Sequence, residues 1–210
     1  MVTLNLLTID LDECERSLDG YKKLLDSNEG IGEKRLDHHF RNNPQLILLM
    51  GSLGISNACN YACQFNVFDE YFSDFAICNL ERNDYVFVEF EEAEKDSIFQ
   101  IKTPGTTKTS YKWSSTLEKG FGQILDWFYR LTDMKDTGKF KEEFDVVGIE
   151  YTGFLVVGRR KHSIPSIGLH EKFDWRRRNV FVQGRPVVCF TFDDLYNEMK
   201  GKLDELRSGL

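Results

Sequence analysis

The chain has 210 residues, 41% of them hydrophobic, which is enough for one domain with a buried core. Its formal net charge of −7 differs from that of a general nucleic-acid binder, so contacts with nucleic acid depend on local groups of basic residues. No apolar segment is long enough to cross a bilayer, and the N-terminus lacks the features of a secretory signal, so we expect a cytoplasmic protein without membrane contact.

The N-terminal part of the chain predicts helices separated by short breaks. Residues 1–9 alternate weakly and fit a strand or an extended arm, whereas residues 11–28 carry leucines and a tyrosine at helical spacing. Residues 32–42 predict a second helix, which the following Asn-Pro pair ends. Periodicity does not decide whether the apolar segment 45–53 is a helix or a strand, and residues 58–68 lead towards the next strand.

The centre of the chain predicts a β-hairpin that ends in carboxylates. Residues 81–84 form its polar turn, and residues 85–90 are the dense run of β-branched and aromatic side chains that is typical of a buried strand. Glu89 and Glu91 share one face of that strand, because side chains alternate along it. The hairpin brings Asp74, at the start of the first strand, back beside them.

These carboxylates would repel one another unless a positive charge lies between them. A divalent cation is the natural candidate, because hard cations take carboxylate oxygens as ligands. The other interpretation is a solvated strand end, since charges at sheet edges protect against aggregation. The residues alone leave both interpretations open.

The stretch after the hairpin predicts a loop and then a helix. Residues 93–114 are polar and irregular, and we expect a long loop beside the carboxylates. The helix at 116–131 carries an apolar face with Gln123 among its residues. Either Ser114 or Ser115 is its N-terminal cap.

The C-terminal part predicts strands and a closing helix. Strands are expected at 145–149, 153–158 and 186–190. Residues 192–206 are amphipathic and predict a helix with Asp193 as its cap. The whole order predicts the α/β (α+β) class, with a central mixed β-sheet flanked by helices.

Asp74, the triplet Glu89-Phe90-Glu91 and a later helix with Gln123 occur in an order that resembles the PD-(D/E)XK nuclease superfamily. Within that superfamily the chain resembles the Shedu-type domain, the effector of a bacterial anti-phage system. Further motifs carry the likeness: FRNNP at 40–44, GQILDW at 122–127, FLVVGRR at 154–160 and FTFDDL at 190–195. The likeness runs from about residue 33 to the C-terminus.

The resemblance implies a restriction-endonuclease-like core in a nuclease-like domain of residues 31–210, with residues 1–30 as a helical or extended appendage. It also implies that the protein hydrolyses phosphodiester bonds of DNA in anti-phage defence and that it needs Mg²⁺ or Mn²⁺. A homo-oligomer or a partner subunit is part of the same expectation.

The resemblance also assigns roles to single residues. Asp74, Glu89, Glu91 and the carbonyl of Phe90 are expected to hold the metal, with Gln123 orienting a water molecule or holding the acids. Glu33 on the early helix is an additional candidate acid. Salt-sensitive contacts with DNA phosphates are expected from Arg159, Arg160, Lys161, Arg176, Arg177 and Arg178. The other interpretation of these arginines is ion pairing with the abundant acids of the chain.

One position departs from the superfamily, which usually has a lysine where this chain has Glu91. That lysine holds the attacking water and offsets charge in the transition state. Lys95, Lys102 or Lys108 in the following loop can substitute for it. Without a substitute, the chain is a catalytically inactive nuclease-fold module that binds DNA or a partner protein, or an assembly domain whose acidic surface binds protein.

Overall fold

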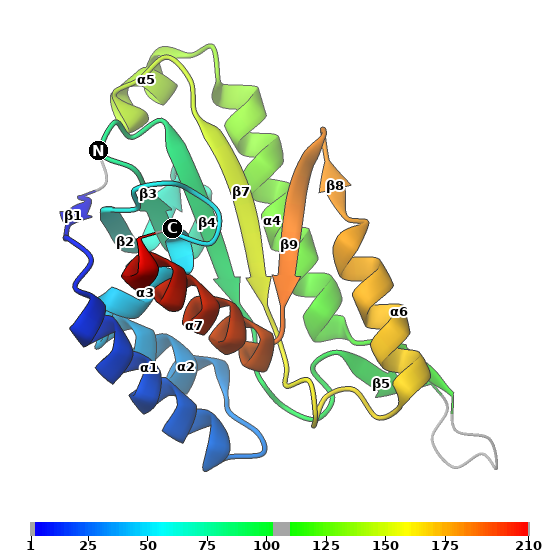
Figure 1. Cartoon of the computed structure of the whole chain (residues 1–210). Coiled ribbons are helices and arrows are strands. Elements are labelled where there is room, and N and C mark those ends of the chain that lie inside the picture. Colours follow the sequence, from blue (N-terminus) through cyan, green and yellow to red (C-terminus); the bar gives the residue numbers. More distant parts are fainter. Residues whose placement is uncertain (1–2, 103–109, 210) are drawn as a thin grey trace.

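The computed structural model describes residues 3–102 and 110–209, which form a mixed β-sheet with helices on both faces (Figure 1). The strands are β1 (Asn5–Leu6), β2 (Asn60–Val67), β3 (Tyr71–Cys78), β4 (Asp84–Phe90), β5 (Phe99–Ile101), β6 (Tyr111–Trp113), β7 (Glu150–Val156), β8 (Phe181–Val182) and β9 (Arg185–Phe190). The helices are α1 (Leu11–Asp26), α2 (Glu33–Arg41), α3 (Pro44–Gly51), α4 (Ser115–Met134), α5 (Gly138–Phe144), α6 (Ile167–Arg178) and α7 (Phe192–Ser208).

The main sheet has the strand order β1-β2-β3-β4-β7-β9-β8, and β5 pairs with β6 in a separate small sheet. Strands β1, β2, β3 and β4 pair antiparallel with one another in that order, whereas β4, β7 and β9 run parallel. The carboxyl ends of these three parallel strands therefore meet at one edge of the sheet. In open sheets with parallel strands, this edge is where ligands bind.

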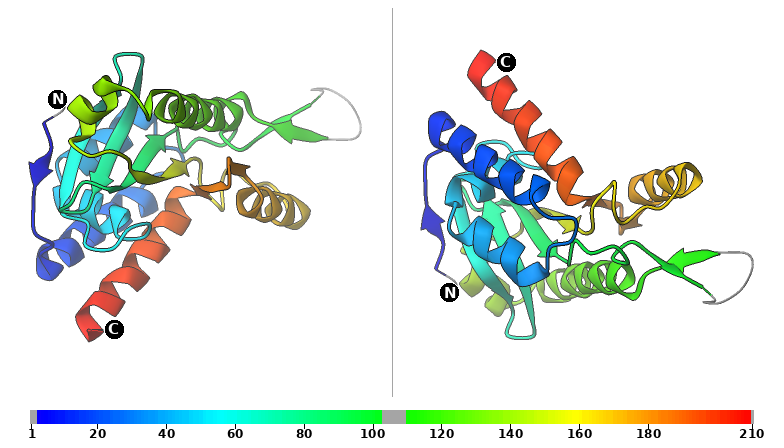
Figure 2. Two further views of the ribbon diagram at one scale, coloured as in Figure 1. Left: turned by 90° about the horizontal axis from the view of Figure 1, so that it is seen from above. Right: turned by 90° about the horizontal axis from the view of Figure 1, so that it is seen from below.

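The sheet separates two buried clusters of apolar side chains. Helices α1, α2, α3 and α7 cover one face, and α4 and α5 cover the other, with α6 beside β9 (Figure 2). Strand β4 lies in the middle, so Val88 and Phe90 belong to the first cluster and Phe87 belongs to the second. Because side chains alternate along a strand, Glu89 and Glu91 lie on the α4 side.

The expected mixed sheet with flanking helices is confirmed, and the helices predicted at 11–28 and 32–42 are present as α1 and α2. The ambiguous segment 45–53 is the buried helix α3. The segment predicted as an appendage packs into the main core through α1, whose Tyr21 is fully buried and donates a hydrogen bond of 2.9 Å to the carbonyl of Phe192. No helix in the described residues is long and apolar enough to cross a membrane.

Tertiary contacts account for a first difference from the sequence prediction. Residues 93–114 contain the β5–β6 hairpin instead of a loop without secondary structure. Phe99 and Trp113 stack across this hairpin with ring centroids 4.6 Å apart, and the ammonium of Lys172 on α6 lies over the Trp113 ring. These contacts join distant parts of the chain, so local periodicity does not reveal them.

Backbone geometry accounts for two further differences. The strand predicted at 145–149 is wrong, because Asp145 has a left-handed conformation (φ 60°) that ends α5, and β7 begins only at Glu150. The cap predicted at Asp193 is also wrong, because the Thr191 side chain accepts the first-turn hydrogen bond from the backbone of Asp194. At α4, the structure selects Ser114 from the two predicted caps.

One glycine in the contact between β7 and α4, and one on the open side of α4, give a matched test of this packing. A Cβ atom on Gly153 of β7 would lie 2.6 Å from Ile124, so we expect Gly153→Ala to lower the free energy of unfolding by about 1–3 kcal/mol. A Cβ atom on Gly122 meets nothing within 4 Å, so Gly122→Ala should raise it by about 0.5–1 kcal/mol. Denaturant unfolding of both variants measures the two effects, and equal values would contradict the packing of α4 on β7.

Candidate functional site

The site begins where β3 and β4 stop pairing. The last paired residues are Phe75 and Val88, and beyond them the carboxylate of Asp74 accepts a hydrogen bond of 2.7 Å from the backbone N–H of Phe90. A side chain thus replaces the strand partner that β4 has lost. The structure places Asp74 beside Glu89, close enough for their charges to act on each other.

Three carboxylates meet at this point, but they are not equally compensated. Asp74 has the Phe90 N–H and the nearby charge of Arg41 on α2. Glu91 forms an ion pair with Lys119 on α4, with 3.0 Å between Oε1 and Nζ. Glu89, only 5% exposed, has neither a hydrogen bond nor an ion pair with any residue that the structure describes.

The electrostatics follow from this uneven compensation. Burial raises the pKa of Glu89 far above its ordinary value, and the charges of Asp74 and Glu91 raise it further. Burial also raises the pKa of Asp74, although the Phe90 hydrogen bond acts in the opposite direction. A buried carboxylate without a partner is costly, so the cluster favours either a proton or a cation at Glu89.

Helix α4 contributes Lys119 to the cluster and carries Gln123 one turn further on. Lys119 and Gln123 are four residues apart and therefore lie on the same side of the helix. Gly120 lies against the strands, since a Cβ there would be 3.1 Å from Cγ of Glu91 and 2.4 Å from the Leu155 side chain. The Oε1 atom of Gln123 is buried and lacks a hydrogen-bond partner in the described part of the chain.

Helix α2 contributes further charges from the other side. Glu33, Asp37 and Arg41 follow one another at intervals of four residues, so they form one stripe along α2. The charge of Glu33 raises the pKa of Asp74, Glu89 and Glu91, which places the predicted additional acid near the cluster. One oxygen of Asp37 binds Arg41 Nε at 2.6 Å, and the other is buried without a hydrogen-bond partner among the residues described.

The lysine that contacts the acids is not one of the predicted substitutes. Lys95 lies with Lys161 at a hollow between Gly30 and Glu94, and Lys102 is exposed at the end of β5, whereas Lys108 lies outside the described residues. Lys119 was missed because it comes from a separate helix. Its position one turn before Gln123 is the signal in the sequence that identifies it.

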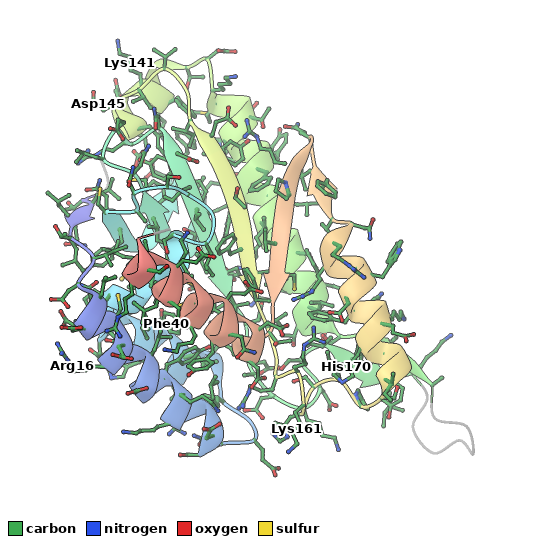
Figure 3. All side chains as sticks on the ribbon, viewed as in Figure 1. Arg16, Phe40, Lys141, Asp145, Lys161 and His170 are labelled. Atoms are coloured by element: carbon green, nitrogen blue, oxygen red, sulfur yellow. The ribbon has the colours of Figure 1, made fainter. Side chains whose placement is uncertain are left out.

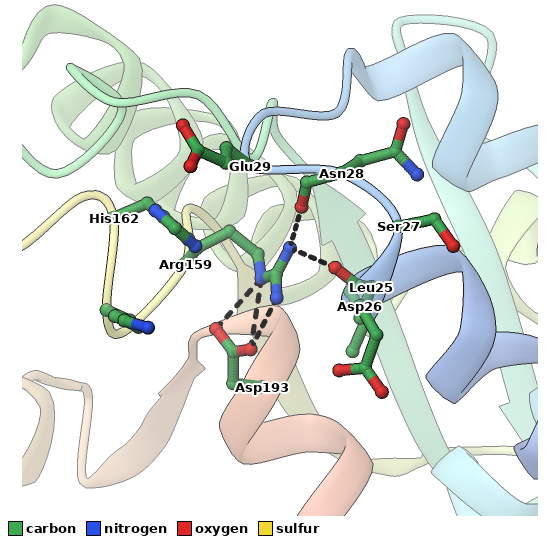
Figure 4. A pocket seen from close by; sticks show the side chains of 9 residues that line it. Leu25, Asp26, Ser27, Asn28, Glu29, Arg159, His162 and Asp193 are labelled. Atoms are coloured by element: carbon green, nitrogen blue, oxygen red, sulfur yellow. Dashed lines mark hydrogen bonds and ion pairs between the residues drawn. The ribbon is translucent and has the colours of Figure 1, made fainter.

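The predicted DNA-binding arginines are mostly engaged within the protein. Arg159 is 5% exposed, binds both carboxylate oxygens of Asp193, and donates to the carbonyls of Leu25 and Asn28 at 2.9 and 2.8 Å (Figure 4). It lies at a hollow of about 410 Å³ between the end of α1 and the start of α7. The structure therefore shows Arg159 in an ion pair within the protein, which is the alternative to DNA contact that the sequence left open.

Three further arginines of that set also have partners. Ion pairs join Arg160 to Asp174 and Asp194, Arg177 to the same two aspartates, and Arg176 to Glu118. Lys161 and Arg178 are exposed, and Lys161 lies at the end of the molecule where the parallel strands finish (Figure 3). A role of this set in DNA binding stays a prediction.

A metal site is not preformed by side chains alone. Within residues 3–102 and 110–209, no group of three or more His, Cys, Asp or Glu side chains has the arrangement that would hold a metal ion. The buried acids therefore offer carboxylate oxygens of the right chemistry without a closed set of ligands. Mg²⁺ commonly binds through only one or two protein carboxylates, with water and substrate completing its shell.

The structural position of Arg159 leads to a stability prediction. Arg159→Met should lower the free energy of unfolding by about 3 kcal/mol, because it leaves Asp193 and two carbonyls without their partner. Lys161, an exposed residue close to Arg159 in sequence, gives the matched control. Lys161→Met should change the free energy of unfolding by less than about 0.5 kcal/mol. Equal free energies of unfolding for Arg159→Met and Lys161→Met in urea would contradict the structural role of Arg159.

The pKa of Glu89 leads to a second prediction, for the metal-free protein. Its pKa is raised from 4.5 to about 9, so the folded state binds the proton more tightly than the unfolded state. This contribution to stability is complete below pH 4.5 and is lost as the pH rises towards 9. At pH 8 the free energy of unfolding of Glu89→Gln should therefore exceed that of wild type by at least about 1 kcal/mol, with a higher melting temperature. Near pH 4.5 the two proteins should be equally stable.

The control for this experiment is the exposed Glu142→Gln, which should follow wild type at every pH. Melting temperatures in EDTA at several pH values measure the effect. A difference in melting temperature between Glu89→Gln and wild type that stays constant with pH would show that the pKa of Glu89 is not raised in the folded protein.

Comparison with known proteins gives one family. The chain has no match among curated proteins. The family model described as "Shedu protein SduA, C-terminal" matches residues 31–196, a region that runs from α2 into α7 and includes all the acids described above. The chain therefore belongs to the Shedu SduA C-terminal family.

Proposed function

We propose that this protein is a metal-dependent DNA endonuclease that acts in anti-phage defence. The observation that carries the proposal is Glu89, a buried carboxylate without a partner in the described chain, between two other carboxylates. Membership of the Shedu family supports the defence role, because the chain resembles the effector domain of such a system. The position at the carboxyl end of a central strand supports a ligand site.

The donor set fits a hard divalent cation. Asp74 and Glu89 supply carboxylate oxygens, which Mg²⁺ and Mn²⁺ prefer over nitrogen or sulfur. A cation at Glu89 would offset the charge that burial makes costly. Glu91 and the Phe90 carbonyl are further candidate ligands from the sequence, and Glu33 is the additional acid beside them. When bound, such a cation polarises a phosphate and lowers the pKa of a bound water.

The protein's own residues would supply position and charge. Hydrolysis joins a water oxygen to phosphorus, breaks the bond to the leaving sugar oxygen, and transfers one proton from the water to that oxygen. Gln123, whose carbonyl oxygen is buried and unpaired within the described residues, is suited to accept a hydrogen bond from the water. Of the predicted basic set, Lys161 and Arg178 are exposed and suited to phosphate contacts, with Arg178 Nε also donating to the Asp174 carbonyl.

A non-catalytic nuclease-fold module that binds DNA or a partner protein is the second candidate function. The observation that favours it is Glu91, which occupies the position where the superfamily usually has a lysine. Both functions allow a homo-oligomer or a partner subunit. They differ in one measurable property, which is DNA cleavage that needs a divalent metal.

Cleavage of plasmid and linear DNA with Mg²⁺ or Mn²⁺ at low salt tests the proposal. Glu89→Gln and Asp74→Asn should each lower the rate at least about 100-fold, because they remove the charge that would hold the metal. Glu142→Gln, an exposed carboxylate on α5, is the control and should cleave like wild type. Because Glu89→Gln is expected to be at least as stable as wild type, unfolding would not explain its loss of activity.

Two outcomes contradict the proposal. Cleavage that persists unchanged in Glu89→Gln would place the activity elsewhere. Metal binding without cleavage in wild type, measured by a shift in melting temperature with Mn²⁺, would favour the non-catalytic module.

A further inference from the structure

We propose that Lys119 on α4 is the phosphate-facing cation of this site and takes the place of the lysine that the strand lacks. The inference rests on the proposed nuclease function and assigns a residue that the sequence analysis did not select. It begins from one contact, the ion pair between Lys119 Nζ and Glu91 Oε1 at 3.0 Å. Glu91 occupies the strand position where the lysine is missing, so the ammonium lies directly beside that position.

The two partners of this ion pair differ in their access to solvent. The Glu91 side chain is 4% exposed and the Lys119 side chain is 59% exposed. The carboxylate is thus buried, while the ammonium lies at the surface above it. A phosphate that approaches Glu91 from solvent along α4 therefore meets the positive charge of Lys119 first.

The backbone of Lys119 is held firmly relative to the acids. Thr116, in the first turn of α4, donates a hydrogen bond of 3.2 Å to Glu92, directly after the strand acids. Ser114 caps the helix and also donates to the Ser97 carbonyl, which ties the helix start to the preceding segment. Gly120 then allows α4 to lie against Glu91. These contacts fix the origin of the Lys119 side chain, whose long stem is largely exposed.

Arg41, the other cation beside the acids, is less suited to this role. Its Nε is bound to Asp37 at 2.6 Å, and its guanidinium lies over the ring of Phe75. The Lys119 end of its ion pair is 59% exposed while Glu91 is buried, so a phosphate oxygen can approach the ammonium from solvent. A lysine ammonium suits such a contact because it is a compact charge on a flexible stem.

A purely structural role for Lys119 makes a different prediction. In that case Lys119 only neutralises the buried Glu91, and removing both charges together should restore activity. In the proposed role, the substrate phosphate loses the ammonium of Lys119 both when Lys119 alone is replaced and when Glu91 and Lys119 are replaced together. Because Glu91 is itself a candidate ligand, the double variant Glu91→Gln/Lys119→Met separates the two possibilities when it is compared with Glu91→Gln alone.

The experiment compares kcat and KM for DNA cleavage in wild type, Lys119→Met, Lys119→Arg, Glu91→Gln and the double variant. We expect Lys119→Met to lower kcat about 100-fold and the double variant to stay equally low. Lys119→Arg should retain about a tenth of the wild-type kcat, because it keeps the charge. The control is Lys141→Met, an exposed lysine on α5, which should leave kcat unchanged.

Mn²⁺ binding measured by calorimetry gives a readout that does not depend on activity. Lys119→Met should bind Mn²⁺ at least as tightly as wild type, because it removes a positive charge near the acids while leaving Asp74 and Glu89 in place. Tight Mn²⁺ binding with lost cleavage would therefore support the proposed role.

Each other outcome overturns the inference. Wild-type kcat in Lys119→Met, or recovery in the double variant, would show that Lys119 is structural while the nuclease proposal stands. Failure of Lys119→Met to bind Mn²⁺ would show that the substitution damages the metal site itself. A wild-type protein that binds Mn²⁺ without cleaving DNA would overturn both this inference and the proposed function.

Discussion

The close contact of α4 with β4 and β7 determines where the polar side chains of the site lie. Gly153 on β7 admits Ile124, and Gly120 on α4 admits Leu155 and Glu91, so helix and strands approach at both points without an intervening Cβ. Larger residues there would move α4 outwards along with every side chain that it carries. Lys119 reaches Glu91 because small residues bring the two surfaces together.

The separation of β3 from β4 is the second constraint on the site. A sheet normally satisfies its backbone groups by continued pairing. Here the pairing of β3 with β4 ends at Phe75, the residue next to Asp74. The Asp74 carboxylate then receives the Phe90 N–H, which fixes one acid in the opening between the strands. The same hydrogen bond stabilises the ionised form of Asp74, in opposition to burial. Glu89 has no such hydrogen bond in the described chain, and the charge of Lys119 opposes the rise of its pKa only in part.

Local rules were sufficient to predict much of this arrangement. Alternation along a strand placed Glu89 and Glu91 on one face, and the return of a hairpin placed Asp74 beside them, because both effects act over short stretches of chain. Lys119 could not be predicted in the same way, since it lies 28 residues beyond Glu91 and reaches it only through helix packing. The β5–β6 hairpin was missed for the same reason, because the stacking of Phe99 on Trp113 and the cation above them are tertiary contacts. The arginines were ambiguous in sequence, and only their partners showed that Arg159 is buried between Asp193 and two carbonyls.

The position of α1 has a consequence for how this family diverges. The region that defines the family begins at residue 31, yet Tyr21 and Leu25 lie in the same core as α7, and Arg159 inside the region binds carbonyls at the end of α1. The unit of sequence similarity is thus smaller than the unit that folds. Residues on the two sides of this boundary cannot vary independently, because a change of Arg159 alters what the end of α1 must provide. Relatives that lack α1 would need another segment to satisfy Arg159, or another residue in its place.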